Sequence, residues 1–446
     1  MLSDLMWTLI LCVLAMYGLK KPFVAMCVVI FVDTLKPQQL SYSFLAGQPL
    51  SLAFTAILFA SIAINIKDIR VPKKAGLTFL LLFFIGWITY TTNIAQFQDN
   101  AWFKYDYVVK TIILTVFIPF VINTRAKLDA FIGVLICGIA YYVLIGGIRT
   151  ALGQASYGTL LIQTPMGDSG IVETSSLSMV AVFTIPLLFY LKNHSIFKDK
   201  IPGLNLICWL LIVCCALTTI GTYARTGIVG FSVLFFIYAL RSKYKFRIFS
   251  AATLLGISIL LFAPESYLSR MSTISNAEEE GSALGRILVW KWTIDYVKDR
   301  PLTGGGFDSY LANKGEFSEY NQSATIVSDD RAKAFHNIFF EVLGEQGYVG
   351  LFLYSMIIFK VLWLSLQVSR STRNLSWQRN FANTLIVVLF IYCACGMFIG
   401  VAYSPWLFYF LGLVSSLQNT IQEKSVNGFY RRHKTRYQTA GELDKQ

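Results

Sequence analysis

The chain has 446 residues, of which 55% are hydrophobic and only 14% are charged, and its mean hydropathy is +0.57. A soluble domain carries about 25% charged residues, so this composition excludes an ordinary soluble protein. Apolar runs follow one another along the chain, and most approach the roughly 20 residues that a helix needs to cross a bilayer core. Because they are continuous and do not alternate, they also exclude a membrane β-barrel. The composition predicts an all-α polytopic membrane protein.

The formal net charge is +13. Such an excess is typical of the basic cytoplasmic loops of membrane proteins. The basic residues are scattered through short loops with no aromatic-lined groove between them, so we expect no nucleic-acid partner. The eight cysteines all lie within apolar runs without the spacing of zinc ligands, and they predict neither a disulfide framework nor a redox site.

Residues 1–263 are predicted to form an N-terminal transmembrane bundle. The first apolar run lacks the basic start and small-residue cleavage site of a signal peptide, so we expect it to remain as a membrane helix. The first two runs are short for full crossings, which leaves the side of the N-terminus open. The expected spans are 3–18, 22–35, 48–66, 76–93, 107–123, 128–147, 175–191, 204–221, 226–240 and 248–263.

Residues 264–336 form a large polar loop that is predicted to contain active-site elements. Within it, Ser282 is placed to cap an amphipathic helix over about 284–299. Trp290 and Trp292 lie in this helix, and tryptophan favours the membrane interface.

Residues 337–418 are predicted to form the C-terminal transmembrane helices, followed by a basic cytoplasmic tail at 419–446. The expected spans are 337–367, which can begin as a separate short helix, 383–402 and 405–418. With the earlier runs they give about 12 transmembrane helices.

The orientation follows from the Lys and Arg residues of the short loops. Counting spans places the basic loops and the tail on one side, which is expected to be cytoplasmic. The basic loops are 67–74, 125–127, 192–200, 241–247 and 370–379. The loop 264–336, in which acidic residues outnumber basic ones, then falls on the opposite, extracytoplasmic face, as does the shorter loop 94–106.

His336 is the first candidate for chemistry, because it lies where the large loop re-enters the apolar region. An imidazole in that position can act as a general base near neutral pH. The alternative is a structural histidine at the start of a helix. The adjacent Asn337 can orient the ring or bind a sugar hydroxyl, although Asn is also a common helix N-cap.

Arg225 and Arg286 are candidates for binding phosphate, because a guanidinium group holds phosphate oxygens in a bidentate fork. The alternatives are snorkelling of Arg225 toward the membrane surface and a solvated helix face for Arg286. Arg331 and Lys333 add positive charge just before His336, and Arg149 starts another outer loop.

Gly304 and Gly306 are supporting candidates, since the run at 304–306 permits a sharp turn or a close approach of the backbone to a ligand. No strand precedes the run and no Lys-Ser/Thr pair follows it, so it is not a nucleotide-binding fingerprint. The sequence has no Asp-x-Asp pair and no His-Glu-x-x-His motif, so we expect neither a catalytic metal nor a cofactor.

These residues resemble the O-antigen ligase / O-antigen polymerase superfamily, and the likeness is most specific over 285–350. The N-terminal part, with Lys20-Lys21-Pro22-Phe23 and Lys36-Pro37, looks like the O-glycosylation ligase subgroup. The motifs that carry the resemblance are Tyr223-Ala224-Arg225-Thr226-Gly227, Gly285-Arg286 with Trp290, Pro301-Leu302-Thr303-Gly304-Gly305-Gly306-Phe307, and His336-Asn337 followed by Gly344, Gly347 and Gly350.

The resemblance implies a bacterial inner-membrane glycosyltransferase of the GT-C type with a periplasmic active site. Its members take a glycan from undecaprenyl diphosphate and work without metal. Ligases pass the glycan to a lipid A–core oligosaccharide, polymerases to another carrier-linked repeat, and relatives to protein hydroxyls. Carried onto this chain, His336 is the catalytic histidine, and Arg225 and Arg286 face the diphosphate.

We therefore expect an O-antigen ligase that inverts the anomeric configuration, with His336 as the general base. A polymerase or a protein O-oligosaccharyltransferase on the same scaffold is the first alternative, because the acceptor cannot be identified from these motifs. An anion transporter is a further alternative, since arginines at membrane depth also suit anion passage. Transporters commonly show related halves, whereas the polar features here gather in one long loop.

Overall fold

The structure is a computed structural model of the chain. It describes residues 2–72, 76–156, 161–162, 164, 171–243, 245, 247, 250, 281–317, 332–371 and 376–421. Every regular element in these ranges is a helix, which confirms the all-α class. The expected span at 248–263 lies outside the described residues except for position 250, and the tail beyond 421 lies outside them entirely.

The helices of the N-terminal part agree with the expected spans to within a few residues, apart from longer ends on α5 and α6. They are α1 (Leu2–Lys20), α2 (Pro22–Leu35), α3 (Leu50–Ile64), α4 (Gly76–Asn93), α5 (Gln98–Val121), α6 (Arg125–Ala151), α7 (Thr174–His194), α8 (Leu204–Gly221) and α9 (Arg225–Arg241). The start of α5 at Gln98 turns most of the expected outer loop 94–106 into helix, which brings charged residues onto a bundle helix.

Six of the described helices are long and apolar enough to cross a membrane, namely α4, α6, α7, α8, α13 (Ile338–Arg370) and α14 (Ser376–Gly396). The apolar helix α3 is shorter, with 15 residues. A protein with this many apolar helices is a multi-pass membrane protein. The expected total of about 12 spans and the GT-C-type architecture stay predictions.

The C-terminal part differs from the expectation at both ends of α14, which begins at Ser376, seven residues before the expected 383. α14 ends at Gly396, six residues before the expected 402, and a helix follows over residues 405–421. The intervening residues are apolar enough to continue the hydropathy of the span, but Gly396, Gly400 and Pro405 interrupt the helix. α13 does begin as a separate short helix, because Gly347 has non-helical dihedral angles (φ 65°, ψ −169°) that kink it.

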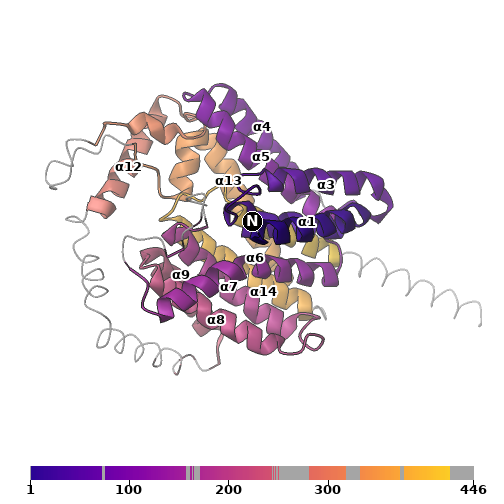
Figure 1. The fold of residues 1–446 in the computed structure, drawn as a ribbon. Helices are drawn as coiled ribbons and strands as arrows, with labels where there is room; N and C mark the ends of the chain where they lie inside the picture. The colour runs from indigo at the N-terminus through magenta and orange to yellow at the C-terminus, as the bar shows by residue number, and fades with distance from the viewer. Residues whose placement is uncertain are drawn as a thin grey trace, which may run out of the picture.

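The helix in the large loop is α12 (Gly281–Lys298), which begins three residues before the expected start, so that Ser282 lies within its first turn. In Figure 1, α12 lies at the edge of the molecule, beyond α13, and it packs against α13. The main bundle is formed by α6, α7, α8, α9 and α14, and α1, α2 and α3 form a second group that joins the bundle through α2 and α6.

The loops predicted to be basic meet at one end of the bundle. Arg125 Nη2 donates a hydrogen bond of 2.7 Å to the carbonyl of His194, whose Nδ1 lies 3.1 Å from Nδ2 of Asn380. The N–H group of Arg70 donates to the Phe120 carbonyl, at the end of α5. We call this the basic end. The starts of α7 and α13 lie at the other end, which we call the cavity end.

Candidate active site

A cavity of about 480 Å³ opens at the cavity end, a size typical of small-molecule sites. Its walls come from both parts of the chain: α2, α5 and α7, then α12, α13 and the residues between α14 and the last helix. The titratable acid, base and imidazole side chains that line it are Asp33, Lys36, Lys104, Glu173, Arg286, His336 and Glu341, and its larger aromatic side chains are Tyr107, Tyr403 and Trp406.

His336 is presented to this cavity by a tightly fixed turn. Its backbone has a left-handed φ of 49°, a conformation that residues other than Gly seldom adopt, with Asn, Asp and His the most frequent exceptions. On one side, Trp290 Nε1 donates a 2.9 Å hydrogen bond to the Phe335 carbonyl, and the Trp290 ring stacks on Phe340 with ring centres 5.3 Å apart. Strained backbone that its surroundings hold in place is common at functional sites.

Asn337 fixes the other side of the turn. Its side-chain oxygen accepts hydrogen bonds from the N–H groups of Phe339 (2.8 Å) and Phe340 (3.3 Å), and its amide donates to the Met397 carbonyl at 3.1 Å. Asn337 is only 3% exposed. The helix N-cap, one of the two interpretations from sequence, is therefore its role in the structure.

The environment of His336 favours the neutral imidazole. The side chain is exposed to the cavity, and the enclosing walls lower the pKa of His336 by making it costly to charge the ring. The positive charge of Arg286 lowers this pKa further, whereas Glu173 and Glu341 act in the opposite direction with smaller effect. A neutral imidazole near pH 7 is the form that can accept a proton.

Arg286 lines the same cavity as His336, so two of the three main sequence candidates share one space. The third, Arg225, is the first residue of α9 and is not among the described residues that line this cavity. Two residues further along α9, Gly227 packs directly against Ser178 of α7. Arg225 is thus at the cavity end, beside the part of α7 that contributes Ser175 and Ser176 to the cavity wall.

The remaining basic candidates are held by other contacts or are not described. Lys333 exchanges two backbone hydrogen bonds of 2.8 Å with the Asn313 side chain, and its Nζ lies 5.5 Å from the centre of the Phe317 ring. Arg149 Nη1 donates a 2.9 Å hydrogen bond to the Leu161 carbonyl. Arg331 lies outside the described residues.

Gly304 and Gly306 make a close approach, but to another stretch of backbone. Gly304 has a φ of 62°, and a Cβ atom there would lie 2.6 Å from the Gly344 carbonyl oxygen. Gly306 has a φ of 81° and packs against Ala95, in the turn after α4. The N–H groups of Gly305 and Gly306 donate 2.9 Å hydrogen bonds to carbonyls just before the kink in α13. This turn supports the short helix that follows His336.

A cluster of buried charges beside the cavity was missed from sequence. Lys104 Nζ lies 2.7 Å from Glu345, 3.0 Å from Glu341 and 3.4 Å from Asp308. Glu341 is only 8% exposed in its side chain and Glu345 is fully buried. Carboxylates one helical turn apart in an apolar run are costly to bury without a partner, and that cost was the signal available in the sequence. In the structure this partner is Lys104 of α5.

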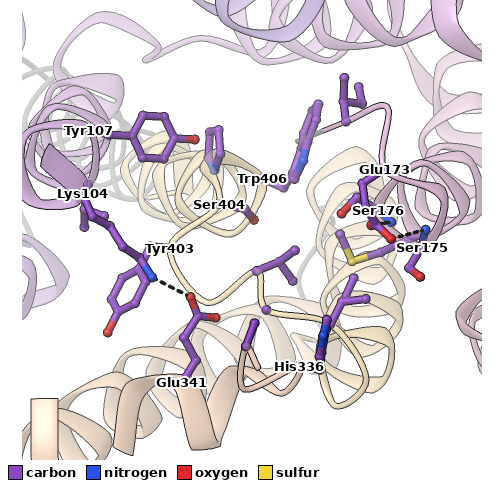
Figure 2. Close-up of a pocket in the computed structure, with 18 of the residues that line it drawn as sticks. Lys104, Tyr107, Glu173, Ser175, Ser176, His336, Glu341, Tyr403, Ser404 and Trp406 are labelled. Atoms are coloured by element: carbon purple, nitrogen blue, oxygen red, sulfur yellow. Dashed lines mark hydrogen bonds and ion pairs between the residues drawn. The ribbon is translucent and has the colours of Figure 1, made fainter. Parts of the chain in front are cut away.

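Glu173 is a second site residue that sequence reasoning missed. It precedes α7 and caps it, because its carboxylate accepts hydrogen bonds from the N–H groups of Ser175 (3.0 Å) and Ser176 (2.7 Å). Figure 2 shows these three residues on one side of the cavity, with Lys104 and Tyr403 on the other. His336 and Glu341 project from the rim between them. Within the described ranges, no group of three His, Cys, Asp or Glu side chains is arranged to hold a metal ion.

Two regions of the chain match known families. Residues 210–355 match the family described as O-antigen ligase. This match over residues 210–355 supports the O-antigen ligase superfamily. Residues 2–196 match a family of unknown function, DUF5935. No curated protein matches the chain.

The cavity is built from both matched regions. The O-antigen ligase region supplies Arg286, His336 and Glu341, whereas the family of unknown function supplies Lys104 and Glu173. The N-terminal region therefore contributes walls and charges to the same cavity.

Proposed function

We propose that the protein is an O-antigen ligase that transfers a glycan from undecaprenyl diphosphate to a lipid A–core oligosaccharide. The observation that carries the proposal is that His336 and Arg286 line one cavity, in a chain whose residues 210–355 match the O-antigen ligase family. A general base and a phosphate-binding cation are the two groups that transfer from a sugar diphosphate requires.

In the proposed reaction, the acceptor hydroxyl attacks C1 of the donor sugar while neutral His336 takes the hydroxyl proton. The new C1–oxygen bond forms as the bond between C1 and the diphosphate oxygen breaks. The electron pair of that bond leaves with the lipid diphosphate, where Arg286 stabilises the added negative charge, with Arg225 assisting from the start of α9. One displacement of this kind inverts the anomeric configuration.

The proposal includes the setting of the reaction. The basic end faces the cytoplasm of a bacterium, as the positive-inside rule predicts, and the cavity end faces the periplasm. The lipid chain of the donor lies among apolar helices of a GT-C-type bundle. The carrier diphosphate is already an activated leaving group, and the arginines supply positive charge without a metal ion.

The test is transfer of a labelled glycan in liposomes that contain the purified protein and the carrier-linked donor. Three acceptors are supplied in separate reactions: lipid A–core, a second carrier-linked repeat and a protein with accessible hydroxyls. Labelling of lipid A–core alone supports the ligase. Labelling of either other acceptor instead identifies a polymerase or a protein O-oligosaccharyltransferase. Flux of anions without donor lipid, together with no transfer, contradicts an enzyme of this class.

A further inference from the structure

The proposed function leaves open where the acceptor binds, and a small space beside His336 addresses that question. Gly400 lies in the irregular segment between α14 and the last helix and lines the cavity. A Cβ atom added to it would lie 3.5 Å from Glu341 Oε2 and 4.0 Å from the backbone nitrogen of His336, with no closer neighbour. A group that rests on Gly400 therefore contacts both the turn that carries His336 and the carboxylate of Glu341.

Glu341 is held in place to receive a hydrogen bond there. Its Oε1 accepts from Lys104 Nζ and its Oε2 accepts from the Ala402 N–H group, both at 3.0 Å. A carboxylate has about four lone-pair sites, so capacity to accept remains on the side that faces the cavity. A fixed hydrogen-bond acceptor such as Glu341 beside a general base suits a sugar substrate. One hydroxyl of the sugar ring can donate a hydrogen bond to the carboxylate while another hydroxyl reacts.

The distribution of charge around the cavity favours different positions for the diphosphate donor and the hydroxyl-bearing acceptor. On the Glu341 side, Lys104 faces the three carboxylates of Glu341, Glu345 and Asp308, so the cluster is anionic in formal charge and repels a diphosphate. Arg286 supplies a cation on another part of the wall. Neutral hydroxyl groups are the chemistry that the anionic side can hold, and Tyr403, with Lys104 Nζ 5.3 Å from its ring centre, forms part of the same wall.

We propose that Gly400 and Glu341 form the acceptor subsite, in which an uncharged, hydroxyl-bearing sugar lies over Gly400 and donates a hydrogen bond to Glu341. The side-chain volume at position 400 then determines which acceptors fit. This inference rests on the proposed function for the identity of the acceptor.

The experiment measures equilibrium binding of two probes, a lipid A–core oligosaccharide and undecaprenyl diphosphate, to the purified full-length protein. Gly400→Ala and Gly400→Val are compared with Gly133→Val, which adds the same side chain on α6 where nothing lies within 4 Å of the new Cβ atom. The Gly400 variants should fold, because an added Cβ atom meets only ordinary van der Waals distances and Gly400 has no positive φ.

Gly400→Val should weaken oligosaccharide binding about tenfold or more, with a smaller loss for Gly400→Ala, and leave diphosphate binding unchanged. Glu341→Gln should weaken binding of the oligosaccharide by a similar factor. The subsite is overturned if the variants bind the oligosaccharide as tightly as the wild type does, or if the wild type does not bind it. It is also overturned if the variants lose affinity for both probes equally. The transfer assay is read separately. Transfer with unaltered acceptor affinity in Gly400→Val removes the subsite alone, whereas predicted binding without transfer removes the proposed function alone.

Discussion

The two ends of the bundle each hold a histidine, and their surroundings differ. His194 is the last residue of α7 at the basic end, where a hollow of about 200 Å³ is lined mainly by polar side chains such as Asn380 and Arg241. It is exposed, and its described neighbours include Arg125. His336 has a left-handed backbone fixed on both sides, and shares a cavity with Arg286 and Glu341. An imidazole acquires a catalytic role from such a setting.

The sharpest way to break this comparison is to remove each histidine in turn. His336→Ala should lower the rate of glycan transfer by about 10³-fold, because the attacking hydroxyl loses its general base. His194→Ala should leave transfer within about twofold, since a polar surface residue away from the cavity contributes little to the barrier. Both rates are measured in liposomes with the carrier-linked donor.

A fold control is needed because the backbone at His336 is strained. His336→Asn tolerates the left-handed conformation but cannot accept the proton, so it should match His336→Ala in rate and the wild type in thermal unfolding. Activity in the Asn variant close to that of the wild type would assign the histidine a structural role.

The arginines give the next largest effect. Arg286→Ala should lower the rate of glycan transfer by about 10²-fold, because charge stabilisation at the diphosphate is lost. It should also weaken binding of the donor more than binding of the acceptor. Arg286→Lys should recover only part of the rate, as a point charge cannot form a bidentate contact. Arg241→Ala, a matched change at the basic end, should have no such effect. Equal losses for donor and acceptor would indicate a structural Arg286.

The pH profile of kcat/KM tests the charges around His336. The neutral imidazole is the active form, so the rate should rise with pH through a pKa below the ordinary value of His and then level off. Arg286→Gln removes a charge that lowers the pKa of His336, so the acidic limb should move to higher pH. Glu341→Gln removes a charge that raises it, and the limb should move the opposite way. If the acidic limb lies at the same pH in the wild type and in both variants, the titrating group is a residue other than His336.

Helix caps at the two ends give the smallest expected difference. Asn337 caps α13 at the cavity end, and Thr124 caps α6 near the basic end through a 3.4 Å hydrogen bond from the Lys127 N–H group. Each change to Ala should cost about 1 kcal/mol of stability, seen as a lower midpoint of thermal unfolding. Only Asn337→Ala should also slow transfer, because its cap positions His336. Equal activity in both variants would separate the cap from catalysis.

The helices could be predicted from sequence because a chain that must satisfy its backbone hydrogen bonds within lipid has few alternatives. The end of α14 was misplaced because hydropathy does not register the break that begins after Gly396. Of the site, His336 and Arg286 carry local motifs, and the structure places both at one cavity. Lys104 and Glu341 are 237 positions apart, and no local pattern connects such a pair. Their contact depends on how α5 and α13 pack.

The most direct test of the account is an electron cryomicroscopy structure of the protein in a lipid bilayer with bound undecaprenyl diphosphate. The account predicts the diphosphate in the cavity, with oxygen atoms within hydrogen-bonding distance of Arg286 and with His336 facing the position of the transferred sugar. A diphosphate bound away from both side chains, or seated at the basic end beside His194, would contradict it.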